Sequence, residues 1–93
     1  MTQQRTIQFH VVVTGDVQDG AFRSFTRRQA LALKLKGWVR NLPDGQVEAV
    51  FHGPEANVNA MVAWCRKGPL QAQVADVQAE RMPLEAFLDF SVR

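Results

Sequence analysis

The sequence IQFHVVVTGDVQDGAFR, residues 7–23, decides the fold of this 93-residue chain. In its first part the odd-numbered positions are apolar, as in a strand that buries one face. A helical pattern starts at Phe22, so residues 15–21 connect a strand to the N-terminus of a helix. Backbone N–H groups converge in such a glycine-containing loop, and the helix dipole adds positive potential. The stretch therefore predicts an anion site, which the guanidinium of Arg23 is placed to close.

The residues that follow predict a helix and a hairpin. The helix covers residues 22–33, and its buried positions recur at intervals of four, four and three: Phe22, Thr26, Ala30 and Leu33. Asp19 is placed to cap this helix, because a carboxylate there accepts a backbone N–H. Strands over residues 36–41 and 46–52 flank the sequence LPDG, in which proline presets the first corner of a turn and glycine takes a positive φ.

A second helix and two extended segments complete the pattern. The helix opens at Gly53-Pro54-Glu55, and Gly68-Pro69 ends it. Its buried stripe consists of Val58, Met61, Val62 and Cys65. Strands are expected over residues 72–80 and 87–92. The order β-α-β-β-α-β predicts one α+β domain over residues 1–93, a ferredoxin-like sandwich with both helices on one face of an antiparallel sheet. That arrangement brings Arg23 and Asn41 to the same edge.

Composition fits an ordinary globular domain in a reducing compartment. The chain is 46% hydrophobic and 22% charged, and it has one cysteine, Cys65, so it forms no intrachain disulfide. No apolar stretch approaches the ~18 residues that a membrane span needs, and the N-terminus does not resemble a signal peptide. We therefore expect a cytoplasmic monomer with no membrane partner. Net charge is only +2, but residues 23–40 carry six basic side chains and no acid; apart from Arg23 and Arg40, we expect these to form a solvated surface.

In the loop and the strand that follows the first helix, the chain resembles an acylphosphatase. The family pattern begins with Gly-(Arg/Lys)-Val-Gln-Gly-Val-x-Phe-Arg, continues after a helix with Gly-Trp-Val-Arg-Asn, and then has an Asp-Gly turn before Val-Glu. The first block is matched at Gly15, Val17, Gln18, Phe22 and Arg23, and the second in full at residues 37–41. Residues 44–49 match the turn and the third strand. The resemblance extends from about Val11 to Phe90, and two blocks at this separation are far more specific than either alone.

The resemblance implies a reaction and a site. The reaction is hydrolysis of a small-molecule acyl phosphate to a carboxylate and inorganic phosphate, without a metal, a cofactor or a covalent intermediate. By resemblance, Arg23 binds the phosphoryl group and Asn41 holds the attacking water. The backbone amides of Val17, Gln18, Asp19 and Gly20 would surround the phosphoryl oxygens. This small set of groups suits the chemistry, because phosphoryl transfer to water with departure of a good carboxylate leaving group needs positioning and charge stabilisation above all.

The loop departs from the family pattern at four positions. Asp16 replaces the usual basic residue, Asp19 replaces the second glycine, Gly20 replaces the valine, and Ala21 occupies the variable position. In one interpretation the glycine has moved by one place to Gly20. In a second, the carboxylates oppose the phosphoryl group and catalysis is reduced or lost, which leaves a small-anion binding or regulatory module. In a third, Asp16 and Asp19 recruit a divalent cation.

Other candidate residues have structural explanations. His10 and His52 lack metal-ligand spacing, Cys65 lies on the apolar stripe of its helix, and both tryptophans suit packing positions. Arg23 could instead pair with Asp16 or Asp19. The same fold also serves RNA recognition, but the third strand, QVEAVF, has a single aromatic residue and an acidic Glu48, so we expect no nucleic-acid partner.

Overall fold

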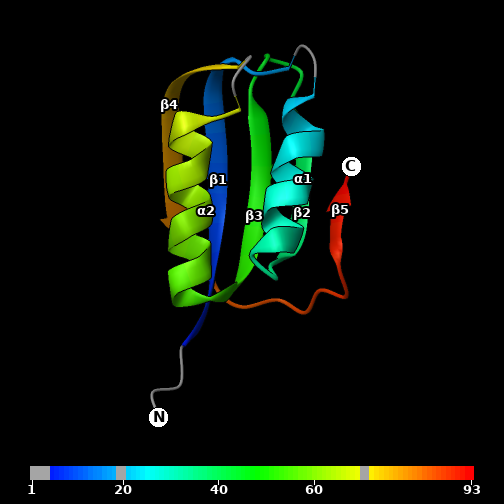
Figure 1. The fold of residues 1–93 in the computed structure, drawn as a ribbon, viewed down its shortest axis with the longest axis vertical. Helices are drawn as coiled ribbons and strands as arrows, with labels where there is room; N and C mark the ends of the chain where they lie inside the picture. The colour runs from blue at the N-terminus through cyan, green and yellow to red at the C-terminus, as the bar shows by residue number, and fades with distance from the viewer. Residues whose placement is uncertain (1–4, 19–20, 70–71) are drawn as a thin grey trace.

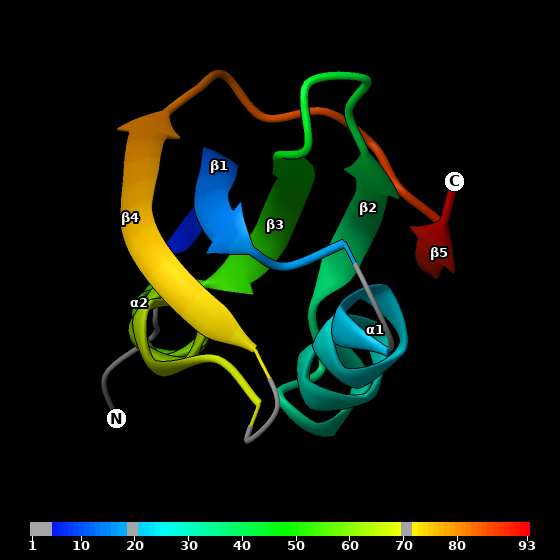
Figure 2. The same cartoon turned by 90° about the horizontal axis from the view of Figure 1, so that it is seen from above.

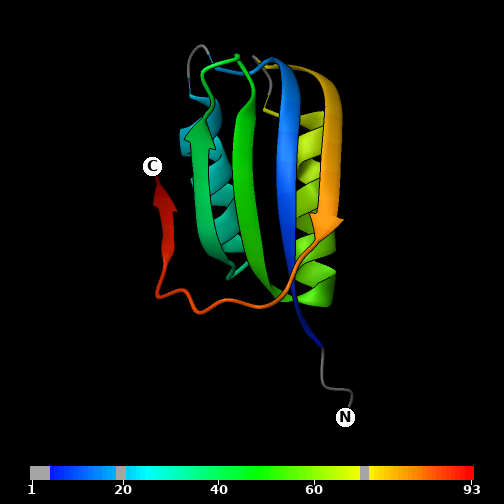
Figure 3. The same cartoon turned by 180° about the vertical axis from the view of Figure 1, so that it is seen from behind.

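Two helices pack against one face of a five-stranded sheet in the residues that the computed structural model describes, 5–18, 21–69 and 72–93 (Figures 1 and 2). The elements along the chain are β1 (Thr6–Asp16), α1 (Phe22–Ala32), β2 (Lys36–Asn41), β3 (Val47–Pro54), α2 (Glu55–Lys67), β4 (Gln73–Arg81) and β5 (Phe90–Val92). The predicted fold class is confirmed. Viewed from behind, the sheet presents a face that no helix covers (Figure 3).

The strand order is β4-β1-β3-β2-β5, and the sheet is antiparallel, as predicted, except at the edge formed by β5. The first four strands pair antiparallel, whereas β5 pairs parallel with β2. The chain crosses the end of the sheet between β4 and β5 before β5 begins. The buried side chain of Gln8 anchors this connection: its Oε1 accepts from the backbone N–H of Glu85 at 2.8 Å, and its Nε2 donates to Glu85 Oε1 at 2.9 Å.

The core consists of the apolar residues that alternate along the strands and of the buried faces of both helices. Val11, Val39 and Phe51 are each 0% exposed, and the Phe51 ring stacks on Phe90 with a centroid separation of 5.7 Å. The predicted helix faces are confirmed at six positions, which are buried: Phe22, Thr26, Ala30, Val58, Met61 and Cys65. The other two predicted residues, Leu33 and Val62, are partly buried against the core, and Leu33 is the C-cap of α1. Burial of this apolar surface, at about 25 cal/mol per Å², is the main favourable contribution to folding.

The helix ends differ in detail from the predictions. Ala21 occupies the N-cap position of α1 and makes no side-chain cap, while Asp19 lies outside the described residues. At the other end the Leu35 N–H donates to Ala30 and the Lys34 N–H to Leu31, which is a Schellman motif. Lys34 takes the position that favours glycine, with φ of 58°. Pro54 is the N-cap of α2 rather than its first helical residue.

The elements predicted to form the site meet at one end of the molecule. The segment after β1, the N-terminus of α1 and the turn between β2 and β3 lie together at the top of Figure 1, and Figure 3 shows the same arrangement from behind. The opposite end carries the connection to β5. No helix within the described ranges is long and apolar enough to span a bilayer.

Candidate active site

Asn41 ends β2 with a buried side-chain oxygen that accepts no hydrogen bond from any described residue. Its backbone pairs with Val47 of β3, which fixes the residue at the end of the sheet where the loop and α1 begin. Its Oδ1 is buried and has no hydrogen-bond partner within the described part of the chain. A buried polar atom without a partner costs about 1–3 kcal/mol, so native proteins rarely leave one without a functional reason. Because no described residue donates to it, Asn41 Oδ1 is a candidate acceptor for a bound water or ligand.

The loop leaves β1 through a β-bulge. The pairing of β1 with β4 shifts register between Thr14 and Gly15, and Gly15 has φ of 138°. A Cβ at Gly15 would lie 2.2 Å from the carbonyl oxygen of Gln73, so only glycine fits. Gly15 and Asp16 belong to β1 and not, as predicted, to the loop. The Val17 side chain is 1% exposed and anchors the start of the loop in the core.

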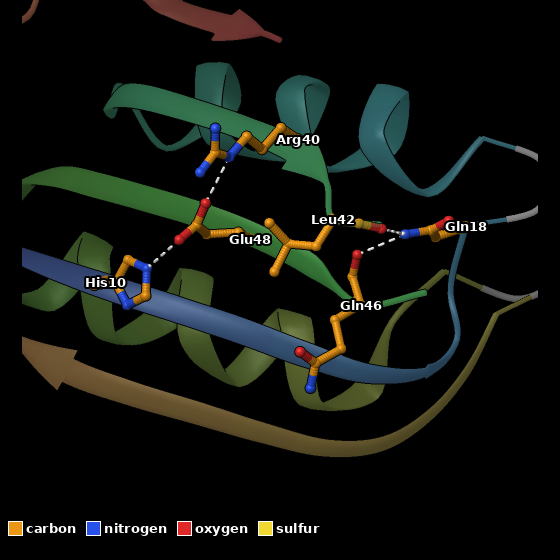
Figure 4. A network of polar contacts seen from close by, with 6 residues as sticks. All are labelled: His10, Gln18, Arg40, Leu42, Gln46 and Glu48. Atoms are coloured by element: carbon orange, nitrogen blue, oxygen red, sulfur yellow. Dashed lines mark hydrogen bonds and ion pairs between the residues drawn. The ribbon is translucent and has the colours of Figure 1, made fainter. Parts of the chain in front are cut away.

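Gln18 connects the loop to the segment that follows Asn41. Its Nε2 donates to the carbonyl oxygens of Leu42 and Gln46, both at 2.7 Å (Figure 4). Leu42 directly follows Asn41, and Gln46 directly precedes β3. The turn between them is as predicted, with Gly45 at φ of 94° and the Asp44 carboxylate accepting from the Gln46 N–H. The structure therefore brings Gln18 and the Asn41 end of β2 together through direct hydrogen bonds.

Arg23 lies in the first turn of α1 and is half-buried. The ion pairs found among the described residues are those of Glu48 with His10 and with Arg40. Arg23 is therefore not paired with Asp16, which is solvent-exposed. Asp19 and Gly20, both predicted to contribute to the loop, lie outside the described residues, so the three interpretations of the altered loop remain predictions.

Arg40, the other basic residue beside the predicted site, is engaged elsewhere. Its Nε donates to Glu48 Oε1 at 2.6 Å, and His10 Nε2 lies 2.7 Å from Glu48 Oε2 (Figure 4). Burial of the Glu48 carboxylate opposes its ionisation, but the hydrogen bonds with His10 and Arg40 outweigh burial and lower the pKa of Glu48 below 4.5. Because adjacent strand residues point to opposite faces, this network lies across the sheet from Asn41.

The other candidate residues make contacts that suit packing and hydrogen bonding within the fold. His52 Nδ1 lies 3.0 Å from the Gln8 Oε1, and burial raises the pKa of the Cys65 thiol to about 12. Both tryptophans are half-buried. No cluster of three or more His, Cys, Asp or Glu side chains that could hold a metal ion occurs in the described ranges.

The sequence did not identify Leu42 and Gln46 as parts of the site. Their backbone carbonyls accept from Gln18, and carbonyl acceptors have no residue-type signature. The side chain of Gln46 also donates to Thr14 Oγ1 at 2.9 Å. That contact could have been inferred only from the register of β1 on β3, which pairs Val13 with Val47 and so brings Thr14 beside Gln46.

Known proteins are similar to this chain over nearly its whole length. The family model described as Acylphosphatase matches residues 9–92. An acylphosphatase of Trichormus variabilis is 50% identical over 91 residues, which cover 98% of this chain and 90% of the relative.

Two solved structures have the same fold. An acylphosphatase from Coxiella burnetii superposes with a TM-score of 0.93 at 40% identity, covering 100% of both chains. One from Bacillus subtilis superposes with a TM-score of 0.90 at 34% identity, covering 94% of this chain and 98% of its own. Sequence and fold together establish that this chain belongs to the acylphosphatase family.

Proposed function

We propose that residues 1–93 form one domain that hydrolyses acyl phosphates at the end of the sheet where Arg23, the loop after β1 and Asn41 meet. The products are a carboxylate and inorganic phosphate, the reaction of the acylphosphatase family. The observation that carries the proposal is the buried Oδ1 of Asn41, to which no described residue donates a hydrogen bond, beside the loop that Gln18 connects to this end of β2.

Arg23 is the residue proposed to bind the phosphoryl group. It is half-buried and has no ion pair with a described residue, so its charge is not neutralised by a neighbouring carboxylate there. A planar guanidinium donates to two phosphoryl oxygens at once, which a lysine ammonium does not. Its place in the first turn of α1 adds the positive end of the helix dipole to the same site.

Asn41 is the residue proposed to orient the attacking water. Its Oδ1, to which no described residue donates, accepts one hydrogen bond from that water, and a lone pair of the water oxygen is then directed at phosphorus. Since the amide does not titrate, the water is positioned and not deprotonated by this residue. The leaving carboxylate departs without a general acid, and charge on the phosphoryl oxygens is stabilised by Arg23 and the loop amides.

The loop is proposed to contribute the backbone N–H groups of Val17, Gln18, Asp19 and Gly20. The side chain of Gln18 already donates to two carbonyls, so its role toward phosphate is limited to its backbone. Asp16 is exposed, and water and salt therefore screen its charge from the phosphoryl group. Similarity to acylphosphatases at about half of all positions does not favour the alternative of a module without catalysis.

The substrate is a small acyl phosphate, and we propose that the enzyme acts as a cytoplasmic monomer without a nucleic-acid partner. The single cysteine is buried and unpaired, which suits a reducing compartment. The face of the sheet that serves RNA recognition in other proteins carries the Glu48 network here, and its carboxylate is ionised at neutral pH.

Benzoyl phosphate hydrolysis tests the proposal. Arg23→Ala and Asn41→Ala are each expected to lower kcat by about 10²–10³, the usual loss when an oriented electrostatic group is removed. Arg28→Ala is the matched control, because it removes the same charge from an exposed position of the same helix; its activity is expected to stay within about twofold of wild type. Full activity in either site variant contradicts the assignment.

The same assay distinguishes the three interpretations of the loop. If Asp19 impairs the loop, Asp19→Gly raises activity or phosphate affinity. If Gly20 has replaced the missing glycine, Asp19→Gly leaves the rate unchanged or lowers it. If Asp16 and Asp19 recruit a cation, EDTA abolishes the activity and Mg²⁺ restores it.

A further inference from the structure

Hydrogen bonds of the Gln46 side chain, backbone N–H and carbonyl oxygen reach three different segments. Its side-chain Nε2 donates to Thr14 Oγ1 at 2.9 Å, and its backbone N–H donates to Asp44 Oδ1 at 3.0 Å. Its carbonyl oxygen accepts both from Gln18 Nε2 at 2.7 Å and from the Leu42 N–H at 2.8 Å. One residue thus contacts the end of β1, the loop and the turn after Asn41.

The hydrogen bond from the Gln46 side chain to Thr14 is not needed to form the turn. The backbone contacts of Gln46 close the turn between β2 and β3 and would form with many residues at this position. The contact with Thr14 instead connects the turn to β1, one residue before the bulge at Gly15 from which the loop departs. It therefore sets the separation between the point where the loop begins and the turn to which Gln18 holds that loop.

We infer that Gln46 is a positioning residue of the enzyme, which fixes the phosphate-binding loop relative to Asn41 through its side-chain hydrogen bond to Thr14. The inference rests on the proposed function, because it supposes that the loop binds the phosphoryl group and Asn41 the water. Gln46 contacts neither the phosphoryl group nor the water. The phosphoryl group is held by the loop and Arg23, so loss of the Gln46–Thr14 bond shifts the water relative to a substrate that stays bound.

This role predicts a specific kinetic signature. In-line attack depends on the distance and angle between the water and phosphorus, and a displacement of about 1 Å far from the chemistry can cost as much as 10²-fold. Affinity for inorganic phosphate depends on the loop and Arg23 alone. Loss of the Gln46–Thr14 bond is therefore expected to lower kcat about tenfold, with KM and the inhibition constant of inorganic phosphate changed less than twofold.

Four single variants of the full chain, and a double variant that combines Gln46→Met with Thr14→Val, test the inference with benzoyl phosphate as substrate. Gln46→Met and Thr14→Val each remove the hydrogen bond while they keep the size of the side chain. Thr14→Ser restores the hydroxyl and is the rescue variant. Gln78→Met makes the same chemical change at an exposed position of β4 and is the matched control. Urea unfolding of each variant gives the folded fraction, by which kcat is corrected.

The expected result is a tenfold lower kcat in Gln46→Met and Thr14→Val, with no further loss in the double variant and near-normal kcat in Thr14→Ser and Gln78→Met. Equal loss of kcat and of phosphate affinity, or normal kcat per folded molecule in Gln46→Met, overturns the role of Gln46. Asn41→Ala, assayed in parallel, separates the two proposals. If that variant is inactive while Gln46→Met is normal, only the inference fails; if Asn41→Ala is fully active, the proposed function fails as well.

Discussion

Replacing Gln18 with methionine removes the two hydrogen bonds that connect the loop to the turn after Asn41, while side-chain length is kept. The bonds are 2.7 Å each, to the carbonyls of Leu42 and Gln46. Both carbonyls retain another donor, the Gly45 N–H and the Leu42 N–H respectively. No acceptor is left unpaired, so each lost bond costs about 1 kcal/mol and the variant about 2 kcal/mol in the free energy of unfolding. For a chain of this size that corresponds to a fall in Tm of roughly 8–16 °C.

Gln18→Glu is nearly isosteric, but it replaces the donating amide with a carboxylate that only accepts hydrogen bonds. An ionised carboxylate cannot donate, and it would face two carbonyl oxygens that it repels. At pH 7 this variant is expected to be less stable than Gln18→Met. Burial beside two carbonyls raises the folded-state pKa of the introduced carboxyl, so its relative stability recovers as pH falls toward about 4, where the carboxyl is protonated and donates one bond.

Urea unfolding at pH 7 and pH 4, followed by far-ultraviolet circular dichroism, measures these differences for wild type and both variants. The expected order of stability at pH 7 is wild type, Gln18→Met, Gln18→Glu, with the last two converging at pH 4. If Gln18→Glu were as stable as wild type at pH 7, Gln18 would not donate to these carbonyls, and the connection between the loop and Asn41 would be refuted.

Three further predictions follow from the packing and the pKa values. Lys34→Gly is expected to raise stability by about 0.5–1 kcal/mol in thermal unfolding, because it relieves a left-handed φ of 58° at a net gain over the entropy cost of glycine; an unchanged or lower Tm would argue against that backbone conformation. Glu48→Gln is expected to lower stability by about 1–2 kcal/mol at pH 7, through weaker bonds to Arg40 and His10. The pKa of Glu48 is lowered, so its contribution is complete above pH 4.5 and is lost as pH falls through the folded-state pKa; a difference between variant and wild type that stays constant down to pH 3 would contradict this. Burial raises the pKa of the Cys65 thiol from 9.0 to about 12, so the folded chain is expected to carry about 10³-fold less thiolate at pH 8 than the unfolded chain. Titration with Ellman's reagent measures this difference. A native thiol that reacts as fast as the denatured one would disprove its burial.

The periodic elements could be predicted from the sequence because their patterns are local. The spacing of Phe22, Thr26 and Ala30 gave the buried face of α1, and alternation gave β1. The paired loop and Gly-Trp-Val-Arg-Asn blocks identified Asn41, whose buried oxygen the structure then showed to be without a described partner.

The remaining features depend on contacts between distant segments. Strand β5 has three residues, and it pairs parallel with β2 after a connection that bonds to Gln8 at Glu85. The extension of β1 to Asp16 depends on a register shift against β4. The bonds of Gln18 and Gln46 required the register of three strands and the shape of a turn, none of which a single residue type reveals.

A phosphate titration followed by NMR tests directly whether this end of the sheet binds phosphate. Signals from the Arg23 guanidinium, the Asn41 side-chain amide and the loop amides are expected to shift together along a single saturable curve, because the anion binds to the loop and Arg23 and changes the surroundings of the nearby Asn41. The exposed Arg28 on the same helix is expected not to follow that curve. Shifts spread over Arg28 and other surface cations without saturation, with Asn41 unaffected, would contradict a phosphate site at this end of the sheet.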